Sequence, residues 1–108
     1  MQSTVKAPIY LFDWGDTLMV DDPMQAGHMK DWPEVSEVAG AAEMLAALAQ
    51  SAVIYVATGA EKTNPERMAA AFQRTRLSSY ISGYFCPANV GFAKSSPDYY
   101  RTIATMLG

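Results

Sequence analysis

Cysteine and histidine each occur only once in this sequence of 108 residues, as Cys86 and His28. A single cysteine cannot form an internal disulfide, and this usage is typical of a reducing compartment. Cys86 is expected to be a small buried hydrophobic residue. Because His28 has no second histidine or cysteine at ligand spacing, a zinc site is not expected.

Long apolar runs and blocks of like charge are also missing. No stretch is long enough to cross a bilayer, and Met1–Pro8 lacks the apolar region of a signal peptide. The net charge of −3 gives no electrostatic reason to expect nucleic acid or an anionic membrane as a partner. These absences favour a cytoplasmic protein.

The residues that are present suit one small domain over residues 1–108, since half of them are hydrophobic and can bury a core. Apolar runs typical of strands alternate with segments of helical periodicity. This alternation implies βαβ units, and therefore an α/β fold with a parallel sheet. Strands are expected at Ile9–Phe12, Val53–Ala57 and Tyr84–Cys86, and helices at about Glu34–Gln50, Pro65–Thr75 and Pro97–Leu107.

Two helix starts carry clear signals. Asn64 before Pro65 and Ser96 before Pro97 each combine an N-cap residue with proline at the first helical position. The last helix is expected to end at Gly108 as its C-cap. Its apolar face is expected to consist of Tyr100, Ile103, Ala104 and Leu107.

The first expected strand, Ile9–Phe12, runs directly into Asp13. Four apolar residues before turn residues predict a buried parallel strand followed by a tight loop. Ligands of open α/β sheets bind at the carboxyl ends of such strands, so chemistry is expected at Asp13. A carboxylate there can attack phosphorus and form an aspartyl-phosphate, with a divalent cation such as Mg²⁺ offsetting the charge repulsion.

Three further positions can bind the phosphate of such a substrate. Gly15 lets the backbone amides approach a phosphate closely, Thr58 follows the second strand with a hydroxyl donor, and Lys94 adds a positive charge. Taken singly, Asp13-Trp14-Gly15 can be just a turn, Thr58 is interpreted as an ordinary strand end, and Lys94 is interpreted as a solvated surface lysine. Their combination with two flanking strands favours a phosphate site.

This set of residues resembles the haloacid dehalogenase (HAD) superfamily of phosphohydrolases. The segment Asp13-Trp14-Gly15-Asp16-Thr17-Leu18 is similar to the first motif of that family, an apolar strand followed by Asp-x-Asp-x-Thr. Thr58 after Val53–Ala57 is similar to the second motif, and Lys94 before a helix is similar to the third. The resemblance covers the chain from Ile9 onward and implies a three-layer α/β/α Rossmann-like core.

The resemblance also implies roles for individual residues. Asp13 would be the nucleophile and a Mg²⁺ ligand, and the backbone carbonyl of Gly15 would be the second ligand. Thr58 and Lys94 would hold the phosphate, with Trp14, Gly15 and Gly59 around it. The connections between the motifs are too short for a cap domain, so the site would be open to a phosphorylated small molecule or macromolecule.

The chain departs from the family pattern within the first motif. Gly15 stands where the family has its acid–base aspartate, and an acid follows one residue later as Asp16. Asp16 is therefore interpreted either as the displaced catalytic acid or as a turn residue. The nearby Asp21 and Asp22 are interpreted as part of a solvated loop.

The fourth motif of the family, a strand ending in acidic residues, is missing. In the family that strand lies beside the first one, so Ile9–Phe12 is expected to form an exposed sheet edge and the core to be incomplete on its C-terminal side. The chain is accordingly interpreted as a fragment, or as one completed by a second polypeptide or a second copy.

Three functions stay open on the sequence. The first is a Mg²⁺-dependent phosphohydrolase acting through an aspartyl-phosphate at Asp13. The second is a catalytically impaired HAD scaffold that binds a phosphorylated ligand or a protein partner, which Gly15 and the missing acidic motif favour. The third is a metal-independent hydrolase of the dehalogenase type, for which an acid at position 15 is not needed.

Overall fold

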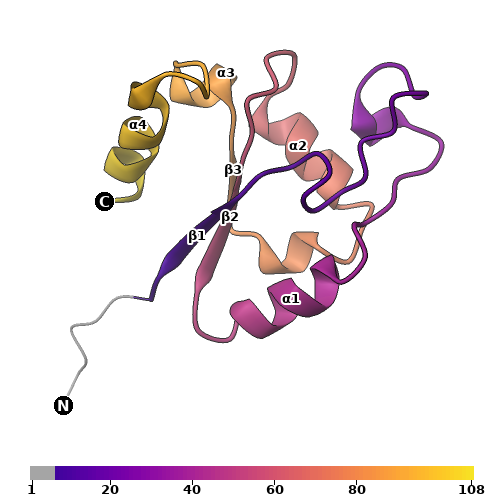
Figure 1. The fold of residues 1–108 in the computed structure, drawn as a ribbon, viewed down its shortest axis with the longest axis horizontal. Helices are drawn as coiled ribbons and strands as arrows, with labels where there is room; N and C mark the ends of the chain where they lie inside the picture. Colours follow the sequence, from indigo (N-terminus) through magenta and orange to yellow (C-terminus); the bar gives the residue numbers. More distant parts are fainter. Residues whose placement is uncertain (1–6) are drawn as a thin grey trace.

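A parallel sheet of three strands organises the chain (Figure 1). The computed structural model describes residues 7–108, so the N-terminal segment in which no signal peptide is expected lies almost wholly outside the described residues. The strands β1 (Ile9–Phe12), β2 (Val53–Ala57) and β3 (Gly83–Phe85) lie in the order β1-β2-β3. The predicted α/β class is confirmed, and β3 begins and ends one residue earlier than expected.

Helices connect the strands and follow the last of them. Asn64 caps α2 by accepting the N–H of Arg67 at 2.8 Å, and Ser96 caps α4 by accepting the N–H of Asp98 at 3.2 Å, as predicted. Among residues 7–108, no helix combines the length and the hydropathy of a membrane-spanning segment. The helices are α1 (Ala41–Leu48), α2 (Pro65–Phe72), α3 (Pro87–Val90) and α4 (Pro97–Leu107), with short 3₁₀ turns η1 (Met29–Asp31) and η2 (Ser78–Tyr80).

Helix α1 is much shorter than the predicted helix over Glu34–Gln50. Gly40 precedes it with a left-handed φ of +82°, which ends any helical path from the residues before it. The segment before Gly40 instead pairs with the loop after β1, where Val38 donates to Leu18 at 2.9 Å and Val20 donates to Ser36 at 2.8 Å. The helical start predicted at Glu34 is therefore wrong, because a long-range pairing takes those residues.

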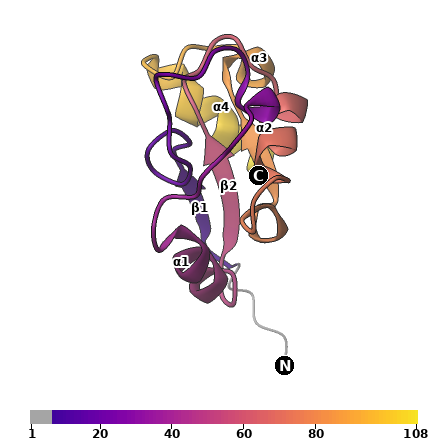
Figure 2. The same ribbon diagram turned by 90° about the vertical axis from the view of Figure 1, so that its right-hand side faces the viewer.

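Alternate side chains of β2 enter different apolar clusters on the two faces of the sheet. Ile54 and Val56 pack in the cluster that includes Leu45 of α1 and Phe72 of α2. Ala57 packs in the cluster that includes Ile103 of α4. Figure 1 shows α1 and α2 on one side of the sheet and α4 on the other, and Figure 2 shows β1 and β2 side by side.

Strand β1 is more exposed than the predicted buried strand. Its neighbour among the described residues is β2 alone, so it forms one edge of the sheet, and Ile9 and Tyr10 are 46% and 44% exposed. The prediction that Ile9–Phe12 is a buried strand is therefore wrong. The prediction that it forms an edge of the sheet agrees with the strand order, because residues 7–108 contain no strand on its other side. Ile9 and Leu11 line an open apolar groove together with residues of α4.

The buried face of α4 differs from the predicted one at Tyr99, Tyr100 and Ala104. Tyr99 is fully buried, whereas Tyr100 is 46% exposed and Ala104 is also exposed. Ile103 is buried as expected. Because α4 covers only part of the sheet, the face that includes Tyr100 borders the open groove instead of the core.

Arg74, just after α2, fixes the irregular connection that follows β1. Its guanidinium donates hydrogen bonds to the backbone carbonyl oxygens of Lys30 at 3.3 Å, Pro33 at 3.2 Å and Trp32. A further contact at 3.5 Å reaches the carbonyl oxygen of Met29. One cation therefore holds four carbonyl groups of η1 and of the two residues that follow it.

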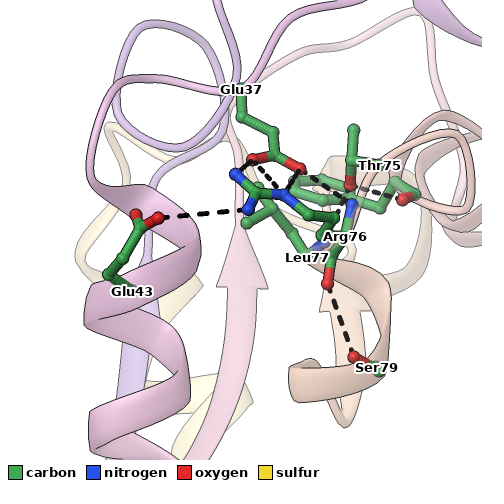
Figure 3. A network of polar contacts seen from close by, with 7 residues as sticks. Glu37, Glu43, Thr75, Arg76, Leu77 and Ser79 are labelled. Carbon is green, nitrogen blue, oxygen red and sulfur yellow. Dashed lines mark hydrogen bonds and ion pairs between the residues drawn. The ribbon is translucent and has the colours of Figure 1, made fainter.

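Glu37 and Arg76 form a second tie between the same connection and the residues after α2 (Figure 3). Oε1 of Glu37 lies 2.7 Å from Nη2 of Arg76, and Oε2 accepts the backbone N–H of Arg76 at 2.8 Å. The Glu37 side chain is only 16% exposed. These hydrogen bonds from Arg76 lower the pKa of Glu37 below its usual value of 4.5.

Glu37 is expected to make the stability of the folded chain decrease at acidic pH. Its pKa is lower in the folded chain, so its stabilising contribution is present above about pH 4.5 and is lost as the pH falls through the lowered value. Glu37→Gln is expected to lower the Tm at neutral pH and to flatten its decline between about pH 5 and pH 3. Glu43→Gln is the control, since that carboxylate is 71% exposed and 3.9 Å from the same guanidinium. An unchanged pH profile in Glu37→Gln would contradict the expectation.

Candidate functional site

Asp13 and Lys94 meet at the carboxyl ends of β1 and β2. Nζ of Lys94 lies 3.1 Å from Oδ1 of Asp13, which directly follows β1. The same nitrogen donates to the carbonyl oxygen of Ala57, the last residue of β2, at 3.2 Å. An ammonium group has three N–H donors, so these two contacts leave one for a ligand. The Asp13 side chain is 53% exposed, and a ligand can therefore reach the pair.

The strand register and one glycine explain this meeting. Phe12 is level with Val56 in the β1–β2 pair, so Asp13 emerges beside the end of β2. Gly59 lies close under Lys94, since a Cβ added at Gly59 would be 3.1 Å from the Cβ of Lys94. A larger residue at this position would push the lysine away. Gly59 therefore contributes by the space it leaves beneath Lys94.

Thr58 lies next to this pair and is 6% exposed. Its backbone N–H donates to the carbonyl oxygen of Phe85 at 2.9 Å, which fixes the chain just beyond β2. Its Oγ1 accepts the N–H of Ala60 at 3.2 Å. A hydroxyl that accepts an amide keeps its own hydrogen for another acceptor, so Thr58 can still donate to a phosphate oxygen.

Tyr99 supports Thr58 from α4 and is absent from the sequence prediction. Its hydroxyl donates to the carbonyl oxygen of Thr58 at 2.6 Å and lies 3.3 Å from that of Phe85. Burial raises the pKa of the Tyr99 hydroxyl, so the group stays a proton donor. The four-residue spacing between Tyr99 and the buried Ile103 is the signal that could have found it.

In the loop after Asp13, the Trp14 side chain is buried, whereas that of Asp16 is exposed. The backbone N–H of Trp14 donates to Oδ1 of Asp13 at 2.9 Å. The centroid of the Trp14 ring lies 6.0 Å from that of the Phe72 ring. Asp16 has a left-handed φ of +60°, and its Oδ1 accepts the N–H of Asp21 at 2.9 Å. In this geometry Asp16 serves as a turn residue, and its carboxylate is engaged within the loop.

A pocket of about 250 Å³ lies beside the loop that follows β1, and neither Asp13 nor Lys94 is among its lining residues. It is lined by the two residues that follow Asp13 and by Thr58, which follows β2. Asp21 also lines it and lies against Gly15, because a Cβ added at Gly15 would be 3.4 Å from both the Cβ and Oδ2 of Asp21. Other side chains around the pocket include Trp32, His28 and Lys62.

The expected Mg²⁺ site has two oxygen ligands. Over residues 7–108, no three histidine, cysteine or acidic side chains converge as a metal-binding group. The Asp13 carboxylate is accessible, and within that part of the chain no donor is hydrogen-bonded to the carbonyl oxygen of Gly15. Carboxylate and carbonyl oxygens are ligands that Mg²⁺ prefers, and it usually keeps several waters, so these two residues fit a water-rich site.

Comparisons of the chain with protein-family models, with curated proteins and with solved structures found no match. The resemblance to the HAD superfamily therefore stays a prediction. The chemistry of Asp13, Thr58 and Lys94 at the carboxyl ends of two parallel strands is the basis for a functional proposal.

Proposed function

We propose that the chain is a HAD-like, Mg²⁺-dependent phosphohydrolase that acts through an aspartyl-phosphate on Asp13. The single observation that carries the proposal is the 3.1 Å pair of Lys94 and Asp13 at the carboxyl ends of two parallel strands. A carboxylate beside a spare ammonium donor suits attack on a bound phosphate. The proposal includes a three-layer Rossmann-like core that lacks a strand beside β1.

In this mechanism the substrate phosphate lies between Asp13, Thr58 and Lys94. The third N–H of Lys94 and the hydroxyl of Thr58 donate to phosphate oxygens, and backbone N–H groups at Gly15 and Gly59 are close enough in sequence to add donors. Mg²⁺, when held by the Asp13 carboxylate and the Gly15 carbonyl, would supply positive charge beside the phosphate.

The covalent step then takes place on Asp13. One carboxylate oxygen attacks phosphorus, the bond from phosphorus to the leaving oxygen breaks, and Asp13 carries the phosphoryl group. Water next attacks the same phosphorus, the bond to Asp13 breaks, and inorganic phosphate leaves. Lys94 stabilises the negative charge on the phosphoryl oxygens in both steps.

A second candidate function is a catalytically impaired scaffold of the same fold that binds a phosphorylated ligand. Two observations favour it. Gly15 has no side chain for acid–base chemistry, and the Asp16 carboxylate is engaged by the N–H of Asp21. Such a scaffold would bind the phosphate group with Asp13, Thr58 and Lys94 and would not hydrolyse the ligand.

Metal removal tests the proposal. With Mg²⁺ present, the protein is expected to hydrolyse 4-nitrophenyl phosphate, and EDTA is expected to reduce the rate to background because the Asp13 carboxylate then faces an uncompensated dianion. Adding Mg²⁺ back should restore the rate. Tight binding of beryllofluoride without turnover would support the scaffold instead. Halide release from a haloacid without metal would support the dehalogenase-type function.

A further inference from the structure

We propose that the pocket beside the loop after β1 binds an aromatic ring of the substrate, so that the chain acts on phosphate monoesters that carry a small aromatic group. This substrate class rests on the phosphohydrolase function proposed at Asp13. Three features of the pocket point to it: the residues that it shares with the phosphate site, the chemistry of its walls, and its size.

The pocket shares two residues with the proposed phosphate site. Gly15 and Thr58 line the pocket, and both are expected to donate to phosphate oxygens. Asp13 and Lys94, the reacting pair, are not among the lining residues. A pocket that is lined by phosphate-binding residues but not by the nucleophile suits the part of a substrate that does not react.

The walls of the pocket are buried apolar side chains. Trp14, Met29 and Trp32 are 9%, 8% and 7% exposed, and all three line it. Nε1 of Trp32 donates to the carbonyl oxygen of Gly27 at 3.3 Å, and Nε1 of Trp14 is buried from solvent. The two indoles therefore offer carbon surface instead of accessible donors. Aromatic rings and thioethers pack well against a further aromatic ring.

The charged residues at the pocket do not select a charged occupant. Asp21 and Lys62 carry opposite charges, and both are exposed. Hydroxyl groups of a sugar would need hydrogen-bond partners on burial, and the three buried wall side chains offer no accessible donor. A ring without hydroxyl groups therefore suits these walls better than a sugar does.

The pocket has the size of one ring with a short linker. Its volume is about 250 Å³, whereas an apolar cavity of about 150 Å³ is enough to bind benzene. The walls are also held in place without a ligand. Arg74 donates to the carbonyl oxygen of Trp32 and contacts that of Met29 at 3.5 Å. A ring can therefore bind without first ordering a loop, which lowers the cost of binding.

NMR spectroscopy can test this pocket directly. The two tryptophans of the chain both line it, so their indole N–H signals report on its occupancy. With Mg²⁺ present, benzylphosphonate, which is not hydrolysed, is expected to shift both signals and to bind at least about 10-fold more tightly than ethylphosphonate. Cyclohexylmethylphosphonate should bind at least about 3-fold more weakly than benzylphosphonate, because only a flat ring stacks well on an indole.

Trp32→Ala is expected to reduce the preference for benzylphosphonate over ethylphosphonate to about 2-fold or less. Trp32→Phe keeps a smaller ring and stays measurable if the alanine variant does not fold, with part of the preference retained. Phe92→Ala is the control, since it truncates an aromatic side chain that lines a different cavity, and it should keep the full preference.

Equal affinities for benzylphosphonate and ethylphosphonate would overturn the aromatic pocket, as would equal binding of the saturated ring. Unmoved indole signals with benzylphosphonate bound, or an unchanged preference in both Trp32 variants, would overturn it too. Hydrolysis of benzyl and ethyl phosphate at equal kcat/KM would leave the phosphohydrolase function intact and remove the pocket from it. If benzylphosphonate binds as expected but no phosphate ester is hydrolysed, the phosphohydrolase function fails and the pocket stands. If neither phosphonate binds and nothing is hydrolysed, both fail.

Discussion

Asp13→Asn is expected to lower kcat for 4-nitrophenyl phosphate by at least about 10³-fold, because the amide that replaces the carboxylate is a far weaker nucleophile. The amide also loses the charge that attracts Lys94 and would hold Mg²⁺. A second readout follows from the covalent step. Acid-quenched protein is expected to carry one phosphoryl group by mass spectrometry, and the variant should carry none.

Asp98→Asn is the control for this variant. The Asp98 side chain is 50% exposed, close to the 53% of Asp13, and it pairs with a more exposed cation, Arg101, at 3.5 Å. Neither change should shift the Tm by more than a few degrees, since exposed ion pairs contribute little to stability. Retention of more than about a tenth of the activity in Asp13→Asn would exclude Asp13 as the nucleophile.

The largest expected effect on stability is that of Phe72→Ala. Phe72 is fully buried at the end of α2, and its ring lies 6.0 Å from that of Trp14 and 5.4 Å from that of Tyr84 between centroids. Truncation leaves a cavity between the site loop and β3. The free energy of unfolding is expected to fall by about 3–5 kcal/mol, a large part of the total for a small domain. Urea denaturation measures this as a lower midpoint at an unchanged slope.

Two further variants serve as controls for this result: Phe92→Ala truncates an exposed phenylalanine, and Phe72→Leu is a milder change at the same buried position. Phe92 is 41% exposed, so its truncation should leave the midpoint nearly unchanged. Phe72→Leu keeps part of the packing and stays measurable even where alanine prevents folding, with an intermediate loss expected. Equal midpoints for Phe72→Leu and the unaltered protein would show that the contact between Trp14 and α2 contributes little.

Local signals in the sequence were sufficient for the first two strands and for the starts of α2 and α4. The apolar runs at Ile9–Phe12 and Val53–Ala57 have the observed bounds, and the pairs Asn64-Pro65 and Ser96-Pro97 begin helices as predicted. These features depend on neighbouring residues alone. The predicted helix from Glu34 failed because the residues before Gly40 pair with the loop around Leu18, a contact that periodicity cannot reveal.

In the candidate site, too, some features could be predicted from the sequence and others depend on long-range contacts. Asp13 and Lys94 were predicted together, and the structure brings them within 3.1 Å. The position of Asp21 against Gly15 depends on how an irregular loop turns back, which sequence patterns do not specify. Tyr99 was missed because two adjacent tyrosines compete for one buried position, and the geometry of the neighbouring strands decides between them.

The hydrogen bonds from Arg74 to four backbone carbonyl groups have a mechanical consequence for the pocket. The segment that carries Asp21 and Trp32 is held at its far end to Arg74, just after α2, through four backbone oxygens on one guanidinium. A hinged lid in this place would have to strip that cation of all its acceptors at once. This side of the pocket, residues 29–33, is therefore expected to open only together with the residues after α2, as one cooperative unit.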